Sequence, residues 1–511
     1  MNVLLIIDKF TEMRMGIVRF SALLLAVVAV LSSGLSASGF ENSGVGTKAR
    51  GMAGAFRATA DDWTAAYYNP AGYAYAYDNQ LGGNMAFVHL RHELVPSYKW
   101  GGQYETGIFN DQTNYNTHEI FSLPSAGFIV RLPVWGETVF GLSAYQPFDY
   151  NITWKLYEPL RAYNNQVSAP ADQFRNNLDV VAFQLTAARE FVEDEFSLGV
   201  GLQVLRGDLL FNSIIFRDNP MKARGDTNSD LWVRPLEKIN EFNNNDGKGW
   251  GFGFTAGGLW KVNEKLNLAA TFRIPFNLTI NGATVSQFYM PDDSTLWFFN
   301  DSAAVGDLGT VGQLFLSGTK VIDYADFETT LKLPPSIALG LSYAASEKLT
   351  IALDAEYTLW SKFEGLDFTY TNHHGLSGPA DSSAFARDFF TADLSYPIDW
   401  ENTGKVMVGA SYDYADFLTL LAGLSADQSP ARKVKQFSPL FVDTGDKYGF
   451  NAGFVIHIER WDLGLVSSYL YHPDLTIATP STFGQEEEFV YFPGDYKAAT
   501  YETILSFNYR F

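Results

Sequence analysis

The sequence predicts an all-β protein, a 14-stranded antiparallel transmembrane β-barrel whose lumen holds a hatch made of N-terminal residues. Three observations support this prediction. Long segments alternate between apolar and polar residues, the connections between these segments alternate between short and long, and an aromatic, glycine-rich stretch precedes the first segment. Inside hydrocarbon only a closed sheet satisfies the hydrogen bonds of every strand, so strands of this kind are expected to close into a barrel.

The clearest alternation runs from Leu349 to Trp360. Every odd position from Leu349 to Leu359 is apolar, whereas Asp354 and Glu356 occupy even positions. Successive side chains of a strand point to opposite faces, so this segment has one apolar face and one charged face. Such runs extend over about 9–13 residues, whereas strands of globular proteins average about five or six and tilted membrane strands need about 9–11. The length therefore favours a membrane barrel over a soluble sandwich.

The alternating segments number fourteen, and six short turns and seven long loops connect them. An even-stranded barrel with both ends on the periplasmic side requires this arrangement. The segments are residues 81–92, 121–131, 137–146, 178–190, 195–207, 250–261, 265–275, 336–345, 348–360, 404–414, 416–426, 447–459, 461–471 and 500–511.

Composition excludes several other classes of protein. Of the 511 residues, 47% are hydrophobic, 15% are aromatic and only 18% are charged, which excludes disorder as the overall state. The chain has no cysteine, so disulfides and cysteine-based metal sites are excluded. The net charge of −21 argues against a nucleic-acid partner.

The N-terminus has the features of an export signal. Arg14 and Arg19 precede an apolar run from Ala22 to Leu31, and small residues follow that run. About ten apolar residues are too few to span a membrane, so we expect residues 1–38 to be a signal peptide that is removed. The rest of the chain is then expected to form a hatch at residues 39–80 and a barrel at residues 81–511 with seven long extracellular loops.

The hatch segment carries a recognisable motif. Residues 44–72 read GVGTKARGMAGAFRATADDWTAAYYNPAG and contain Asn69, Pro70 and Ala71. This run resembles the opening of the FadL family of outer-membrane transporters for long-chain fatty acids and aromatic hydrocarbons, whose hatch carries an Asn-Pro-Ala motif. Residues 249–283, 331–368 and 409–453 also resemble the family, with a departure at Pro335.

The resemblance implies passive uptake of hydrophobic compounds, above all long-chain fatty acids, across the cell outer membrane. It implies capture on the third and fourth extracellular loops, transfer to a lumenal pocket and hatch-gated release through a gap at a kinked third strand. Gly141 and Pro147 lie in or beside that strand. The expected capture residues are apolar and lie in two long loops, with small cores under the loops as the alternative: Phe211, Ile214, Ile215, Phe216, Phe288, Tyr289, Met290, Trp297, Phe298 and Phe299.

A fatty acid carboxylate would require a cation in the lumen. Arg273 and Arg131 lie on the polar phase of their strands and are the candidates. The alternative is that these arginines pair with carboxylates of the lumen such as Asp354 or Glu356.

Two other functions remain open from the residues alone. A general or substrate-selective diffusion porin would have an unplugged, ion-conducting lumen. An outer-membrane lipid-modifying hydrolase would need a serine and a histidine, but the sequence contains no G-x-S-x-G, and His457 alone favours a structural role. We therefore expect no enzyme activity, no catalytic residue and no cofactor, and the adjacent His373 and His374 are too weak a pattern for a metal site.

The last strand ends in an aromatic residue, Phe511. An amphipathic terminal strand of this kind resembles the signal that the outer-membrane assembly machinery recognises. The expected partners are thus this machinery, outer-membrane lipid and a hydrophobic ligand, either a fatty acid or an aromatic hydrocarbon, with no nucleic acid and with the barrel as a monomer.

Overall fold

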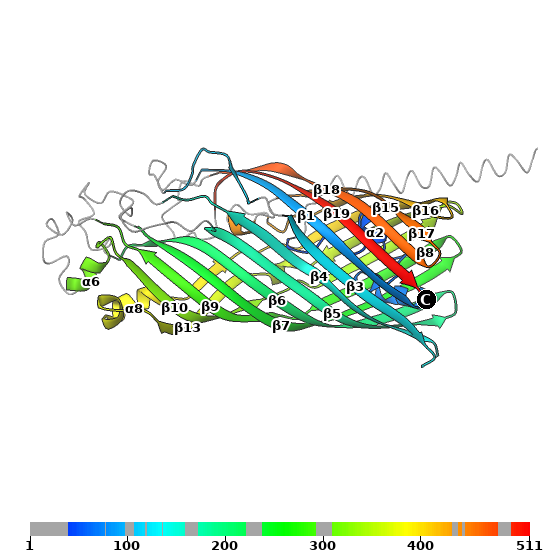
Figure 1. Cartoon of the computed structure of the whole chain (residues 1–511), viewed down its shortest axis with the longest axis horizontal. Helices are drawn as coiled ribbons and strands as arrows, with labels where there is room; N and C mark the ends of the chain where they lie inside the picture. Colours follow the sequence, from blue (N-terminus) through cyan, green and yellow to red (C-terminus); the bar gives the residue numbers. More distant parts are fainter. Residues whose placement is uncertain are drawn as a thin grey trace, which may run out of the picture.

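The computed structural model of the chain is a closed antiparallel barrel seen side-on in Figure 1. It describes residues 39–76, 78–97, 107–117, 120–134, 136–158, 172–220, 238–292, 309–431, 438–441, 445–478 and 492–511. Nineteen strand segments belong to one sheet. When interrupted strands are counted once and the two-residue β2 (Asn114–Tyr115) is set aside, they form fourteen wall strands. The predicted 14-stranded barrel is confirmed.

Ten wall strands are continuous. Their bounds are β1 Gln80–Pro96, β3 Ile120–Leu132, β4 Thr138–Trp154, β5 Phe174–Val192, β6 Phe196–Asp218, β7 Lys238–Asn263, β16 Leu418–Asp427, β17 Lys447–Ile458, β18 Trp461–Ile477 and β19 Gly494–Arg510. The sheet closes where β1 pairs with β19, from Gln80 opposite Arg510 to Pro96 opposite Gly494. Closure leaves no open edge between the first strand and the last, as hydrocarbon demands.

Four neighbouring wall strands are interrupted at the same level of the barrel. The pairs of segments are β8 (Leu266–Pro275) with β9 (Leu278–Tyr289), β10 (Lys320–Leu331) with β11 (Ser336–Ala344), β12 (Leu349–Thr358) with β13 (Gly365–His374), and β14 (Leu394–Pro397) with β15 (Thr403–Ala415). β9 pairs with β10 on the side of the long connections, and β8 pairs with β11 on the side of the short turns. Pro335, the departure noted above, lies in one break, where no ladder hydrogen bond is lost.

The barrel wall follows the predicted alternation. In β6, Leu198, Val200, Leu202 and Val204 are exposed on the outer face, while the intervening residues are buried towards the lumen. The strands β6 and β7 are longer than the predicted segments and stay paired as far as Asp218 opposite Lys238. Alternation alone did not predict this extension, because Ile214, Ile215 and Phe216 are all buried and the period-two pattern is lost there.

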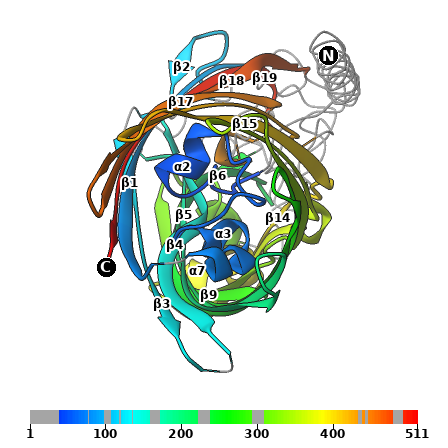
Figure 2. The same cartoon turned by 90° about the vertical axis from the view of Figure 1, so that its right-hand side faces the viewer.

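The N-terminal residues fill the lumen at the end of the barrel that carries the short turns (Figure 2). They form helices α2 (Thr47–Gly51) and α3 (Ala65–Tyr68) and the 3-10 helix η1 (Pro70–Tyr75). η1 packs against β4 to β7, and α2 packs against β16 to β19. Most of these residues are buried, although the segment is short and largely non-helical, because the barrel wall encloses it.

The opposite end carries the long connections and three short helices (Figure 1). These helices are α6 (Gly309–Leu314), α7 (Pro379–Ser382) and α8 (Ala384–Phe390), and the 3-10 turns η4 (Trp360–Lys362) and η6 (Pro439–Phe441) lie in the interior cluster. In the described ranges, every helix is too short or too polar to cross a membrane. The predicted signal peptide, residues 1–38, lies outside the described residues.

Candidate functional site

Buried ion pairs tie the hatch to the barrel wall. Arg57 of the hatch donates from its guanidinium to Asp354 (3.2 Å) and Glu356 (2.6 Å), both on β12. Arg50 of α2 pairs with Glu502 of β19. Burial lowers the pKa of Arg57, but the carboxylates of Glu356 and Asp354 outweigh this effect and raise the pKa above its ordinary value. The hatch therefore stays charged and paired where it meets the wall.

The Asn-Pro-Ala motif is a connector between the hatch and the wall. The Asn69 amide donates to the carbonyl of Arg57 (3.0 Å) and to that of Gly258 in β7 (3.2 Å), and its side-chain oxygen accepts from the amide of Ala71 (3.1 Å). A Cβ atom on Gly257 would lie 2.0 Å from the Asn69 oxygen. The motif thus requires a glycine in the wall opposite it, because only a residue without a side chain allows this close approach.

The barrel wall has a window between β3 and β4. Pairing between these strands stops at Ala126 opposite Ala144, and β4 then shifts register against β5 between Tyr145 and Phe148. Among the described residues, the chain ahead of β3 meets β4 again where the amide of Thr117 donates to the carbonyl of Thr153 (2.9 Å). We call this wall window the gap between residues 120–125 of β3 and residues 145–152 of β4.

The leading residues of the hatch cover the β4 side of the wall window. The amide of Asn42 donates to the carbonyl of Pro147 and the amide of Asp149 donates to the carbonyl of Phe40, both at 3.0 Å, and Glu41 forms an antiparallel bridge with Phe148. Residues 40–42, the sealing segment, therefore occupy part of the strand edge that β3 leaves free. Pro147 lies in the register shift, the position where the sequence indicated weak pairing. Gly141, by contrast, is paired with β3, and a Cβ atom there would clash with Tyr73.

Phe40 inserts into a group of aromatic rings that we call the aromatic socket. Its ring centroid lies 4.8 Å from that of Trp360, 5.1 Å from Phe363, 5.8 Å from Trp400 and 5.9 Å from Phe148. Three of these rings come from the breaks in β12/β13 and β14/β15, and the fourth comes from the edge of the wall window. The broken strands thus supply the side chains that hold the sealing segment in place.

Arg273 of β8 is a buried cation beside the sealing segment. Its guanidinium pairs with Glu41 at 2.5 Å, donates to the carbonyl of Tyr67 (3.2 Å) and lies 4.4 Å from the Tyr67 ring centroid. Its Nε atom has no hydrogen-bond partner within the described part of the chain. Burial and then the charge of Glu356 raise the pKa of Glu41 above its ordinary value, against the opposite effect of Arg273. Glu41 therefore takes up a proton more easily than an ordinary carboxylate does, although it lies close to Arg273.

Arg131 lies elsewhere, at the end of the barrel that carries the short turns. Its guanidinium donates to the carbonyls of Ala74 (2.8 Å) and Ala76 (3.2 Å), and it lies 3.9 Å from Glu137. The structure therefore does not bring the two predicted arginines together, and neither pairs with Asp354 or Glu356.

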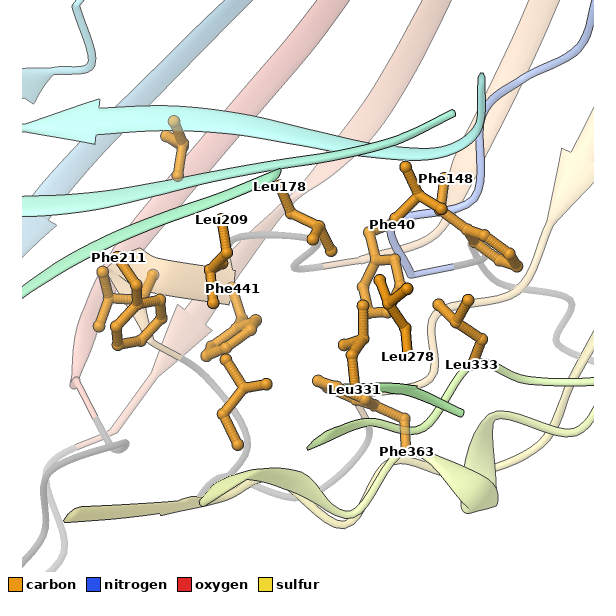
Figure 3. Packing of buried hydrophobic residues seen from close by; sticks show 14 of the residues in the cluster. Phe40, Phe148, Leu178, Leu209, Phe211, Leu278, Leu331, Leu333, Phe363 and Phe441 are labelled. Carbon is orange, nitrogen blue, oxygen red and sulfur yellow. The ribbon is translucent and has the colours of Figure 1, made fainter. Parts of the chain in front are cut away.

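A large cluster of buried apolar residues extends through the lumen from the hatch to the residues beyond it. Figure 3 shows Phe211, Leu209 and Phe441 on one side of this lumenal cluster and Phe40, Leu278 and Leu331 on the other. Tyr67, which stacks against Arg273, belongs to the same cluster. The cluster therefore joins an apolar interior to a buried cation, the two features that a long-chain acid requires.

The predicted capture residues that the structure describes are buried, and all of them lie in strands except Met290, which directly follows β9. Phe211, Ile214, Ile215 and Phe216 belong to β6 and the lumenal cluster. Tyr289 of β9 faces the same cluster, whereas Phe288 and Met290 pack with residues of α7 and α8 and with Phe315. Trp297, Phe298 and Phe299 lie outside the described residues. The apolar stretches were expected in loops, and the structure instead uses them to extend the wall and line its interior.

Phe511 completes the terminal strand. Its amide donates to the carbonyl of Asn79 (3.0 Å), and its exposed ring stacks against Phe128 and Tyr509, each with a centroid distance of 6.1 Å. The aromatic end of the chain thus lies on the outer surface, next to the seam between β1 and β19.

Glu41, Phe40 and the aromatic socket have no signal in the local sequence. Glu41 lies in a segment without periodicity, and its partner Arg273 is 232 positions away, so no local pattern relates them. Trp360 and Trp400 follow regular strands, and their turn into the lumen depends on strand breaks that are visible only in the fold.

A family model and a related outer membrane protein both match most of the chain. The family model described as Outer membrane protein transport protein (OMPP1/FadL/TodX) matches residues 28–511. Outer membrane protein P1 of Haemophilus influenzae is 22% identical over 440 residues, which cover 80% of this chain and 81% of that protein.

Two solved structures have a similar fold. A FadL homologue of Pseudomonas aeruginosa has a TM-score of 0.70 and 18% identity, over 93% of this chain and 100% of that one. The toluene transporter TodX of P. putida has a TM-score of 0.61 and 14% identity, over 92% of this chain and 99% of that one.

Proposed function

Because the chain belongs to the OMPP1/FadL/TodX family of outer membrane transport proteins, which carry hydrophobic compounds, we propose that its substrates are long-chain fatty acids taken up passively. One observation carries this choice over aromatic hydrocarbons. Arg273 is a buried cation that contacts the lumenal cluster through Tyr67 and keeps an unpartnered Nε–H. A hydrocarbon has no group that such a cation would bind, whereas a carboxylate matches it.

Capture begins on the apolar residues at the ends of β6 and β9 that lead into the third and fourth long connections. The described members, from Phe211 to Phe216 and from Phe288 to Met290, are buried, so this step needs a movement that opens a path between them. Burial of the apolar chain of the ligand supplies enough free energy for capture. Burying about 400 Å2 of a sixteen-carbon chain at about 25 cal/mol/Å2 contributes about 10 kcal/mol before entropic costs are subtracted.

In the lumen the ligand carboxylate replaces Glu41 on Arg273. Removing an ionised group from a buried cation is costly unless another anion takes its place, so the exchange is favourable only for an acid. The raised pKa of Glu41 lowers the cost of releasing it. Glu41 is also the residue that bridges Phe148 at the wall window, so its release loosens the sealing segment.

Release follows through the wall window into the membrane. Outside the barrel an apolar depression of about 980 Å3 begins at Ala126 and Ala144, the last pair below the wall window, and continues over Leu142, Phe183 and Phe252. A lipid-facing depression of this kind gives an alkyl chain an apolar route away from the wall window. No energy input is required, because the ligand moves down its gradient.

Three further parts of the proposal concern biogenesis and assembly state. Residues 1–38 are a signal peptide that is cleaved on export, which leaves the hatch at residues 39–80 and the barrel at residues 81–511. Phe511, exposed at the end of the last strand, is a contact for the outer-membrane assembly machinery. The barrel works as a monomer, because each barrel contains its own hatch and lumen.

Uptake by reconstituted vesicles tests the function. Vesicles with the wild-type barrel are expected to take up palmitate faster than empty vesicles, and vesicles with Arg273→Gln should lose this difference while retaining uptake of toluene. Faster uptake of toluene than of palmitate, unchanged in Arg273→Gln, would contradict the preference for acids. Ion conductance typical of an open pore in the wild type would instead support the alternative of a diffusion porin.

A further inference from the structure

A second group of polar side chains lies in the lumen beside the wall window, in a pocket that Glu41 lines but Arg273 does not. His92 of β1 and His472 of β18 face each other with a ring-centroid distance of 6.1 Å. They are 5% and 4% exposed. None of their four ring nitrogens has a hydrogen-bond partner within the described part of the chain. Buried polar atoms without partners are rare and destabilising, so a facing pair of them points to a group that binds between the rings.

The two rings line a cavity of about 90 Å3, which we call the histidine pocket. This volume is enough for a polar head. The rest of the lining includes Val88 and Leu90 of β1 and Phe121 and Leu123 of β3, the free side of the wall window. A polar head in the histidine pocket would therefore have apolar side chains beside it for its tail.

The residues that line the histidine pocket favour a group that accepts hydrogen bonds over a metal cation. Lys447 lines the histidine pocket and donates to the carbonyl of Gly39 at 3.4 Å, and Asp149 lines it from β4. Glu41 of the sealing segment also lines the pocket but is paired with Arg273, and Asp149 has Lys447 in the same lining, so each carboxylate has a cation nearby and the imidazoles decide the preference. Zn2+ usually takes four ligands, and among the described residues no group of three or more His, Cys, Asp or Glu side chains is suited to a metal.

We propose that the histidine pocket binds the carboxyl head of the ligand as a second subsite at the wall window. The two oxygens of a carboxyl group match the two imidazole N–H donors, whereas an alcohol offers one oxygen and a hydrocarbon none. The hatch residues Gly39 to Ser43 form another side of the histidine pocket, so the head reaches it beside the sealing segment. This inference rests on the proposed uptake of fatty acids and adds an exit station to it.

Palmitate labelled with 13C at its carboxyl carbon tests the proposal on the purified full-length barrel in detergent. The wild type is expected to give two bound carboxyl signals in NMR spectra. The double variant His92→Leu/His472→Leu should lose one signal, and Arg273→Gln should lose the other. The variant His92→Gln/His472→Gln keeps an N–H donor at each position and should retain both signals.

His89→Leu is the matched control, because His89 lies on the same strand but on its outer side, near Tyr501. It should retain both signals. A single bound signal that Arg273→Gln removes and the histidine variants leave intact would overturn the proposal while uptake still stands. Tight binding of Zn2+ alone, lost in the leucine variant, together with only the Arg273-dependent signal, would also overturn it. No bound palmitate in the wild type would overturn both proposals.

Discussion

Arg57 of the hatch and Glu356 of β12 are joined by an ion pair of 2.6 Å inside the barrel, with both side chains almost completely buried. Asp354, two residues earlier on the same strand, shares the same guanidinium. A buried charge without its partner is strongly destabilising, so this triad resists any motion that separates the hatch from β12. We expect the sealing segment to move more easily. The wall holds it by two backbone hydrogen bonds, by the ion pair between Glu41 and Arg273, and by the Phe40 ring in the aromatic socket.

Replacing Arg57 by Met should detach the body of the hatch. The change leaves Asp354 and Glu356 buried without a cation, and we expect a loss of about 3–5 kcal/mol in the stability of the docked hatch. Faster hydrogen exchange at residues 47–60 and a higher ion conductance in planar bilayers would report this loss. Lys332→Met is the control, because the Lys332–Glu364 pair is exposed and solvent screens its charges. Equal behaviour of the two variants would contradict the assigned role of Arg57.

Adding one methyl group to the wall should displace the Asn-Pro-Ala motif. Gly257→Ala places a Cβ atom 2.0 Å from the Asn69 oxygen, whereas in Gly258→Ala the nearest atom is Leu198 Cδ2 at 3.4 Å, an ordinary contact. We expect higher conductance and easier proteolysis of the hatch in Gly257→Ala alone. Because the two glycines are adjacent in one strand, their difference isolates the hatch contact from effects on the barrel. Identical thermal and conductance profiles would show that the motif tolerates displacement.

Glu41→Gln should strengthen binding of the acid. The variant keeps the size of the side chain but removes the anion that occupies Arg273, so a ligand carboxylate no longer competes with it. Calorimetry should give an increase of about tenfold in the affinity for palmitate, with no change for hexadecane. Glu364→Gln, at an exposed carboxylate, serves as the control. Weaker binding of palmitate in Glu41→Gln would mean that Glu41 supports the ligand and does not compete with it.

Deleting Phe511 should slow assembly without altering the assembled barrel. The residue ends the last strand with an exposed ring that contacts only Phe128 and Tyr509 among the ring contacts described, so its removal takes little from the core. Pulse-labelled cells should show delayed appearance of the folded barrel. Normal assembly kinetics would assign the exposed ring a purely structural role.

The sequence predicted the wall of the barrel well, because lipid outside and polar groups inside impose a period of two on every strand that crosses. It predicted the extracellular ends less well. Beyond Phe211 both faces of β6 are covered, so Ile214 to Phe216 are all buried and read as an apolar loop.

The candidate site shows the same division. Arg273 was named as a candidate cation of the lumen because it lies on the polar phase of its strand. Its partner Glu41 and the socket around Phe40 were not predicted, because they depend on how the hatch returns to the wall after a long excursion of the chain. The position of the wall window did not follow from the sequence, which offered Gly141 and Pro147 alike as places of weak pairing; in the structure Pro147 lies in a register shift of β4, whereas Gly141 is paired with β3.

A cross-link across the wall window tests the central claim most directly, and a chain without native cysteine is well suited to it. In the double variant Asn42→Cys/Pro147→Cys the new thiols flank the bridge between Glu41 and Phe148. We predict that palmitate uptake by reconstituted vesicles stops when the disulfide forms and returns on reduction, while each single variant transports under both conditions. Undiminished uptake with the disulfide fully formed would show that ligands do not leave past the sealing segment.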